Sequence, residues 1–289
     1  MAEIVPQECT TQANGIELHY RDWGGTGDAV VLLHGLASHC GIWDLVAPVL
    51  AQRNRVVALD LRGHGASGKP ADGYDFATVA SDVDQMCRSL NFLRPVVVGH
   101  SWGGNVALQC AVARPYAVSG IVMVDGGFIE PSARKDWTWE RAEEEMAPPL
   151  FGEITLDSMR ERIRSGNLAA HWSPDVERII LENFYVNQEG YARPHLTREN
   201  HMKIVRALWE HQPSRLCPTL ECPSLLLAAR GSVTGNPMEK MREEMVERAR
   251  GLLPNGKVVW MEDTIHDIPL QRPQKLAEMI AEFVSGLAR

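Results

Sequence analysis

Four short, mainly apolar runs in the first half of the chain constrain its fold more than any other feature. They are Ala29–Leu33, Arg55–Leu59, Pro95–Val98 and Ile121–Val124, and helix-like stretches lie between them. Strands without hydrophobic alternation are typical of parallel sheets that are covered on both faces. Parallel neighbours also need long crossover connections, which the helix-like stretches supply. The pattern therefore predicts an α/β protein with a mostly parallel central sheet.

Further elements extend this pattern towards both ends of the chain. Asn14-Gly15 precedes the loosely alternating segment Glu17–Trp23, which predicts an opening β-hairpin. Towards the C-terminus we expect two more strands, Ser224–Ala228 and Lys257–Met261. The expected helices are Trp43–Ala51, Phe76–Leu90, Gly103–Ala113, Met238–Arg250 and Pro273–Leu287.

The alternation of strands and helices stops between residues 128 and 215. This segment shows no strand-like run, contains several prolines and has a helical pattern. Four of the eight tryptophans of the chain lie in it, at positions 137, 139, 172 and 209. We therefore predict a helical cap domain at 128–215, inserted into an α/β core that is formed by 1–127 and 216–289.

Composition excludes several classes of partner. With 29 basic and 37 acidic residues, the net charge of −8 lacks the basic footprint of a nucleic-acid-binding protein. The apolar runs are too short to cross a membrane, and the first residues show no secretory leader. The six cysteines form no C-x-x-C motif, so we expect reduced thiols and no disulfide framework. These features predict a cytoplasmic protein with neither a nucleic-acid nor a membrane partner.

A candidate nucleophile lies directly after the third of the four strands. Gly99-His100-Ser101-Trp102-Gly103 reads G-x-S-x-G and comes just before a helix-like stretch. A serine on such a strand-to-helix turn is held with its hydroxyl outward. The alternative interpretation of this segment is a tight, glycine-rich turn with a purely structural role. We predict that Ser101 is a nucleophile.

A serine nucleophile needs a base, and His266 is the leading candidate. It follows the last predicted strand and precedes the last helix, whereas most other histidines lie in the hairpin or in the insert. A histidine in a loop is often merely solvated, which is the alternative interpretation here.

These segments, taken together, resemble the α/β-hydrolase superfamily over nearly the whole chain. Besides the serine motif, His34-Gly35-Leu36 resembles the oxyanion loop of the family, and Asp60–Gly68 resembles its D-x-R-G-x-G-x-S segment. His266–Pro273 resembles the family's histidine loop. The resemblance implies the α/β-hydrolase fold, with helices on both faces of the sheet and a helical cap, but it does not specify a substrate.

The expected acidic residue is where the chain departs from the commonest pattern of the family. That pattern places an aspartate, as G-x-x-D, after the strand that follows the insert, but Thr234 occupies this place. Asp125 ends the strand Ile121–Val124, where some α/β hydrolases carry their acid. Because adjacent strands lie close together, its carboxylate can reach the same imidazole. We predict Asp125 as the acid; the alternative is an aspartate that caps the following turn.

The resemblance also implies where an oxyanion and a substrate would bind. By position, the backbone N–H groups of Leu36 and Trp102 would form the oxyanion hole. The expected pocket residues are His34, Phe128, Trp137, Trp172 and Trp209. We expect His34 to brace its loop rather than to take part in the chemistry.

Two further patterns are weaker. Gly63–Gly68 fits the dinucleotide-binding motif G-x-G-x-x-G, with Asp82 and Asp84 near the usual offset of a ribose-binding acid. However, Lys69–Gly73 interrupts the helix that should open there, so a glycine-rich surface loop is the better interpretation. The histidines are dispersed and no H-E-x-x-H motif occurs, so we expect neither a metal nor another cofactor.

The sequence thus predicts a serine hydrolase with the triad Ser101, His266 and Asp125. Its expected substrate is a small or medium-sized, largely apolar carboxylic ester, thioester or lactone, cleaved through an acyl-enzyme. Alternatives on the same scaffold are a C–C bond hydrolase of ring-fission products, a cofactor-free dioxygenase and a non-enzymatic ligand receptor. Epoxide hydrolases and dehalogenases of this fold use an aspartate nucleophile, so Ser101 argues against both.

Overall fold

The computed structural model describes residues 4–232 and 237–287 and opens with a β-hairpin. β1 (Gln7–Ala13) pairs antiparallel with β2 (Ile16–Gly24). Asn14 and Gly15 form the turn with φ angles of 44° and 77°. Such positive angles are accessible mainly to glycine and, less readily, to asparagine. The predicted hairpin is therefore confirmed.

The central sheet has eight strands in the order β1-β2-β4-β3-β5-β6-β9-β10. All neighbours from β4 to β10 pair in parallel, which confirms the predicted mostly parallel sheet. The parallel strands are β3 (Ala29–Leu33), β4 (Arg55–Leu59), β5 (Val96–His100), β6 (Gly120–Val124), β9 (Ser224–Arg230) and β10 (Gly256–Glu262).

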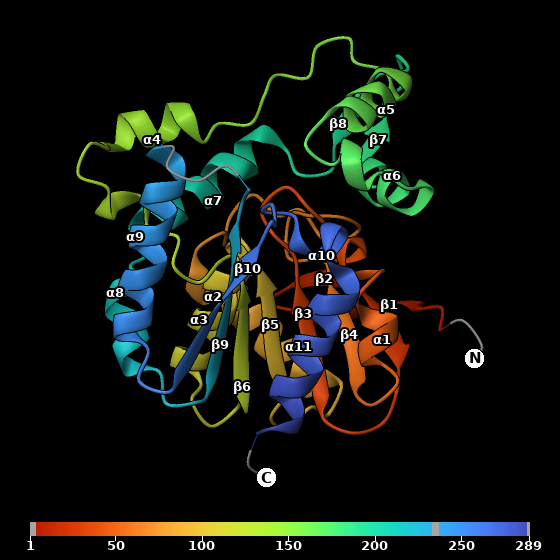
Figure 1. The fold of residues 1–289 in the computed structure, drawn as a ribbon. Coiled ribbons are helices and arrows are strands. Elements are labelled where there is room, and N and C mark those ends of the chain that lie inside the picture. The colour runs from red at the N-terminus through yellow and green to blue at the C-terminus, as the bar shows by residue number, and fades with distance from the viewer. Residues whose placement is uncertain (1–3, 233–236, 288–289) are drawn as a thin grey trace.

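Helices cover both faces of this sheet, as Figure 1 shows. α2 (Phe76–Ser89), α3 (Trp102–Ala113) and α9 (Pro237–Leu252) contribute to one apolar cluster. α1 (Ala47–Leu50) and α11 (Pro273–Ser285) contribute to the cluster on the opposite face. Successive residues of β3 enter the two clusters alternately, which explains why its sequence shows no polar alternation.

One predicted helix is shorter than expected. The segment 43–51 forms the end of a 3-10 helix, η1 (Cys40–Trp43), followed by the single-turn helix α1. Pro48 lies in the first turn of α1. A proline is tolerated there because the first N–H groups of a helix have no partner, but it would break a helix that ran through it.

The insert, defined as residues 128–215, contains most of the helices that remain. Thr138, Thr155, Ser173 and Thr197 each accept a backbone N–H bond at the start of a helix, as capping residues do. These helices are α4 (Trp139–Glu145), α5 (Leu156–Ser165), α6 (Pro174–Leu181) and α7 (Arg198–Glu210). The short elements are η2 (Pro131–Ala133), η3 (Ala169–His171) and α8 (Pro213–Leu216), and, beyond the insert, η4 (Cys217–Thr219) and α10 (Ile268–Gln271).

The insert is not entirely helical, which corrects our expectation. β7 (Phe184–Val186) and β8 (Ala192–Pro194) form a small antiparallel sheet. The turn between them is closed by a hydrogen bond from the Asn187 N–H to the Tyr191 carbonyl. Strands of three residues are too short to produce a recognisable alternation, so the sequence pattern missed them. The division into a core and a cap domain stays a prediction.

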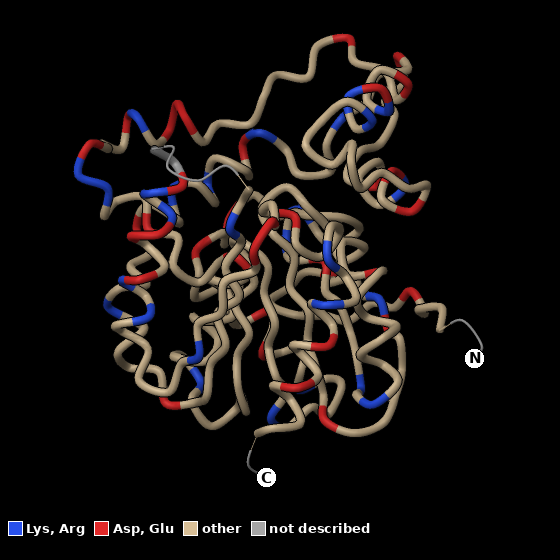
Figure 2. Tube along the Cα trace, in the orientation of Figure 1, with Lys and Arg blue, Asp and Glu red and all other residues tan. Residues whose placement is uncertain are grey.

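The insert lies over the edge of the sheet at which the parallel strands end (Figure 1). Acidic and basic residues are mixed over both the core and the insert (Figure 2). All six cysteines are free thiols. Among the described residues, the helices are too short or too polar for any of them to cross a membrane.

Candidate active site

Ser101 lies on the turn between β5 and α3, so the strand and helix predicted around it are confirmed. Its φ of 53° and ψ of −122° are strained for a residue with a side chain. Its N–H donates to the Val124 carbonyl at 2.9 Å. A side chain at Gly99 would collide with the backbone of Gly103, so glycine is required for this close turn. The serine side chain is thus held at the end of the sheet by the backbone.

Asp125 and His266 are hydrogen-bonded to each other, although 141 positions separate them. The Oδ2 atom of Asp125 accepts a bond from His266 Nδ1 at 2.6 Å. Its Oδ1 atom accepts the Ala229 N–H of β9 at 3.0 Å. With Nδ1 as the donor, the Nε2 atom of the neutral imidazole is left as a base. The contact with Asp125 therefore fixes both the position and the tautomer of His266.

This contact changes the pKa of both groups. Burial raises the pKa of Asp125, but the hydrogen bond and charge of His266, together with Arg242, outweigh burial and lower it. Burial lowers the pKa of His266, but the hydrogen bond and charge of Asp125 outweigh burial and raise it. The pair therefore combines an ionised carboxylate with an imidazole that is more basic than usual, as a general base requires.

Arg242 of α9 is a further partner of Asp125 that the sequence analysis missed. Its Nη1 atom donates to Oδ2, the same oxygen that accepts His266 Nδ1. The arginine side chain is 28% exposed, whereas that of Asp125 is 1% exposed. Nothing in the local sequence distinguishes Arg242 from the other charged residues of α9, because its partner lies 117 positions earlier.

Ser101 and His266 open into one cavity of about 410 Å³ between the core and the insert. The core contributes apolar groups such as Leu36, and the insert contributes Ile163 and Leu168. Arg162, also from the insert, is the cationic side chain among the lining residues. Asp267 of the core also lines the cavity, so the site combines apolar walls with one cationic and one acidic side chain.

Leu36 belongs to the loop after β3, which passes close to the serine. A Cβ atom on Gly35 would lie 3.1 Å from the Cβ of Ser101. His34 braces this loop, since its Nε2 accepts the Leu61 N–H at 3.0 Å. Burial lowers the pKa of His34 to about 4, so its neutral ring can accept this bond. Trp102, the other expected oxyanion donor, is the first residue of α3.

His64 and His100 are two more buried histidines near this site. His64 Nε2 accepts the Ala37 N–H at 3.2 Å and so also holds the loop after β3. His100 Nε2 donates to the His266 carbonyl at 2.9 Å. Burial lowers the pKa of His100 to about 3. Both rings therefore act as neutral braces around the catalytic candidates.

The five expected pocket residues do not line this cavity, which corrects the sequence-based expectation. His34 is fully buried, and Phe128 lines a different cavity. Trp137 is covered by the guanidinium of Arg134 at 3.7 Å, and Trp172 is 41% exposed. Trp209 packs edge-on against Trp139 with ring centroids 6.2 Å apart. The tryptophans of the insert thus pack against each other or beneath arginines, whereas aliphatic side chains face Ser101.

The loop Gly63–Gly68 is folded around Asp60. The Oδ2 atom of Asp60 accepts the Ala66 N–H at 2.9 Å, and its Oδ1 atom accepts the Cys40 N–H at 2.7 Å. Asp82, one of the two candidate acids of the dinucleotide interpretation, instead receives two bonds from Arg62, at 2.7 and 2.9 Å. These contacts support the interpretation of this segment as a structural loop.

Among the described residues, one group of side chains has potential metal ligands within 4.8 Å of one another: His19, Cys40 and Asp60. The carboxylate of Asp60 already accepts His19 Nδ1 at 2.8 Å in addition to the backbone N–H groups. The carboxylate oxygens of Asp60 therefore act as hydrogen-bond acceptors that hold the loop in place. Thr234, the residue at the commonest acid position, lies outside the described residues.

Comparison with known proteins supports this description of the fold. The structure of E-2-(acetamidomethylene)succinate hydrolase superposes on this chain with a TM-score of 0.76 at 20% identity. That comparison covers 97% of this chain and 100% of the other. At this identity the similarity shows the fold alone.

Curated relatives match over different lengths. An uncharacterized protein of Mycobacterium bovis is 40% identical over 105 residues, and the match covers 36% of this chain but only 31% of that protein. The AB hydrolase superfamily protein YfhM of Bacillus subtilis is 25% identical over 94% of this chain and 96% of its own length. The sequence profile described as the alpha/beta hydrolase family matches residues 30–279. The chain therefore belongs to the alpha/beta hydrolase family.

Proposed function

We propose that this protein is a serine hydrolase that cleaves a small or medium-sized carboxylic ester, thioester or lactone. The observation that carries the proposal is the 2.6 Å bond between His266 Nδ1 and Asp125 Oδ2. Ser101 and His266 also line the same cavity. A nucleophile, a base and a group that orients the base are the parts that acyl transfer requires.

In the proposed reaction, His266 Nε2 takes the proton of the Ser101 hydroxyl while the serine oxygen attacks the acyl carbon. The alcohol or thiol then leaves with that proton, and an acyl-enzyme remains. Water then gives a proton to the same imidazole and attacks the acyl carbon. The imidazolium returns this proton to the Ser101 oxygen as the bond between that oxygen and the acyl carbon breaks, and the acid is released. Asp125 stabilises the imidazolium that forms in each half of the reaction.

The oxyanion of each tetrahedral intermediate needs two hydrogen-bond donors. We assign the backbone N–H groups of Leu36 and Trp102 to this role. The closeness of the loop at Gly35 to Ser101 supports the first assignment. The position of Trp102 at the start of α3 supports the second, because the first N–H groups of a helix have no partner within it.

We further propose that the insert acts as a cap that shapes the substrate cavity. Ile163, Leu168 and Ile179 supply an apolar wall opposite the serine loop. A volume of about 410 Å³ suits a small or medium-sized ligand. We therefore still expect an apolar substrate, but the apolar contacts would come from aliphatic residues of the insert rather than from its tryptophans.

The test is turnover of p-nitrophenyl esters of increasing acyl length, together with labelling by a fluorophosphonate. We expect turnover and labelling by the native protein and loss of both in Ser101→Ala. Ser38→Ala is the matched control, because Ser38 lines the same cavity. This variant should keep both the ester turnover and the fluorophosphonate labelling. If no ester is turned over and Ser101 is not labelled, the proposal is wrong. Oxygen consumption with a heteroaromatic substrate would instead favour the dioxygenase alternative.

A further inference from the structure

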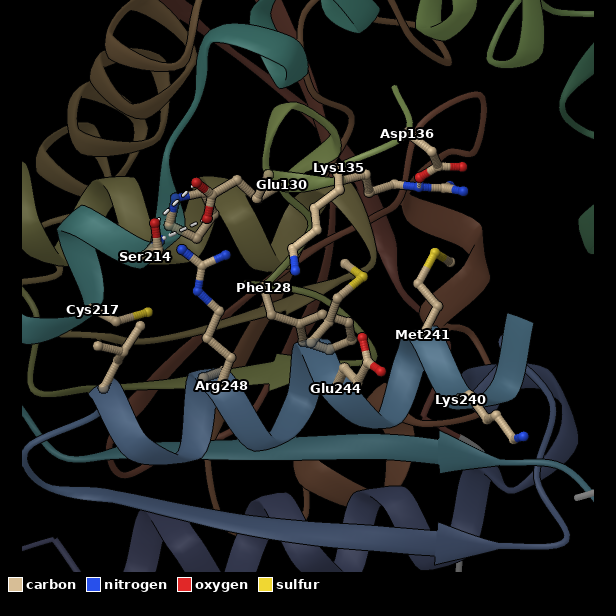
Figure 3. A pocket seen from close by; sticks show the side chains of 16 residues that line it. Phe128, Glu130, Lys135, Asp136, Ser214, Cys217, Lys240, Met241, Glu244 and Arg248 are labelled. Atoms are coloured by element: carbon tan, nitrogen blue, oxygen red, sulfur yellow. Dashed lines mark hydrogen bonds and ion pairs between the residues drawn. The ribbon is translucent and has the colours of Figure 1, made fainter. Parts of the chain in front are cut away.

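A second cavity of about 580 Å³ lies between α9, α8 and the segment that follows β6 (Figure 3). It shares no lining residue with the cavity at Ser101. Its volume falls in the range of small-molecule sites, which is about 300–1,000 Å³. It is therefore a separate candidate binding site.

The floor of this second cavity is apolar. Met241, Met245 and Leu252 of α9 contribute to it, and Phe128 comes from the segment after β6. Residues spaced by three or four positions share one face of a helix, which brings the α9 side chains together. Methionine side chains are flexible and adapt to ligands of different shape. Such a floor suits an aliphatic chain better than a rigid polar group.

Two cationic side chains reach over this floor from opposite walls. Figure 3 shows Lys135 extending from the segment after η2 and Arg248 extending from α9. Within the described part of the chain, neither of them forms an ion pair, although Glu130 and Glu244 line the same cavity. Glu130, a nearby acid, is instead engaged by Ser214, whose N–H and hydroxyl donate to it at 3.0 and 2.9 Å. Glu130 keeps its charge in these bonds, so the two cations share the cavity with acidic groups but form no direct ion pair with them.

We propose that this cavity binds a medium-chain aliphatic carboxylate. Its head group lies between Lys135 and Arg248, and its chain lies over Phe128 and the two methionines. The guanidinium of Arg248 presents paired donors that match a carboxylate. Figure 3 shows Lys135 and Arg248 extending into the cavity, whereas Lys240 points away from it. The cationic residues of the lining are Arg134, Lys135, Lys240 and Arg248, and the acidic residues are Glu130, Asp136 and Glu244.

Calorimetric titration of the whole protein with sodium decanoate tests this site. We expect saturable binding of one decanoate per chain, weaker binding of octanoate by about threefold or more per methylene removed, and weaker binding of decanol and decyl phosphate. The double variant Lys135→Met/Arg248→Met should bind decanoate at least about tenfold more weakly. Met245→Trp, which fills the floor and keeps the charges, should also weaken binding.

Arg162→Met is the matched control, because it removes a cation from the cavity at Ser101 instead. It should bind decanoate like the native protein. Thermal melting of each variant establishes that it is folded. Absence of saturable binding, unchanged binding by the folded double variant, or loss of binding in Arg162→Met alone would each overturn the proposal. Tighter binding of decyl phosphate than of decanoate would overturn the assignment of a monoanion.

Discussion

Arg242 donates a hydrogen bond to the same oxygen of Asp125 that binds His266 Nδ1. The carboxylate is therefore shared between a permanent cation and the imidazole. The positive charge of Arg242 lowers the pKa of His266 and so opposes the effect of Asp125. In the proposed reaction, α9 would thus moderate the basicity of His266 from outside the Ser101 cavity.

Replacing Arg242 by methionine should raise the pKa of His266, because an opposing positive charge is removed. Since the proposed base must be neutral to accept the serine proton, the acidic limb of the kcat/KM profile should move to higher pH. The measurement is the pH dependence of ester turnover. Arg242→Lys keeps the charge and should leave the limb close to that of the native protein. A limb that stays in place in the folded Arg242→Met variant would contradict this role.

Asp125→Asn should lower kcat by about three to four orders of magnitude, because the amide cannot stabilise the imidazolium or fix its tautomer. The control is Asp263→Asn, which changes an exposed carboxylate three positions before His266. It should retain near-native turnover. Near-native turnover by folded Asp125→Asn would instead show that another group orients His266.

Arg162→Met should reduce kcat/KM selectively for esters that carry a carboxylate at the far end of the acyl chain. Arg162 is the cationic group in the wall of the cavity, and a hydrogen bond to a charged group contributes about 1.5–3 kcal/mol. We therefore expect a loss of about tenfold or more for the charged esters. Neutral esters of equal length should be turned over as before. An equal loss for both kinds of ester would indicate a structural effect.

Acid should destabilise the fold through three buried histidines. Burial lowers the pKa of His34, His100 and His211 to about 4, 3 and 4. Because the unfolded chain binds protons at a pKa of about 6.5, their contribution to stability is complete above that pH and is lost as the pH falls. At pH 5 each should cost about 2 kcal/mol of unfolding free energy relative to pH 7.

His266 has the opposite sign, since its raised pKa stabilises the fold below about pH 6.5 and this contribution is lost as the pH rises through the folded value. His19, whose pKa the hydrogen bond to Asp60 raises, acts in the same direction as His266. These two groups do not offset the three buried neutral histidines together with His64, whose pKa burial also lowers. Urea unfolding at pH 7 and pH 5 measures the net effect. Equal unfolding free energies at the two pH values would contradict it.

The sequence alone determined the core of the fold. Ala29–Leu33 and Arg55–Leu59 are strands with the predicted bounds. They could be predicted because a parallel strand that is buried on both faces consists of consecutive apolar residues. The setting of Ser101 was equally predictable, since a strand, a glycine-flanked serine and a helix are adjacent in the chain. The same local logic explains the hairpin at Asn14-Gly15. It failed at Pro48, where one residue shortened the expected helix, and for the three-residue strands β7 and β8.

Only the tertiary structure decided which groups meet across the chain. The bond between His266 and Asp125, which sequence position merely suggested, depends on how β6 and β10 are ordered in the sheet. Arg242 could not be foreseen, because a charged residue on a helix has no local signal for a partner 117 positions away. The walls of the Ser101 cavity were misjudged for the same reason. Composition places aromatic residues in the insert, but the packing of its helices decides which side chains face the cavity.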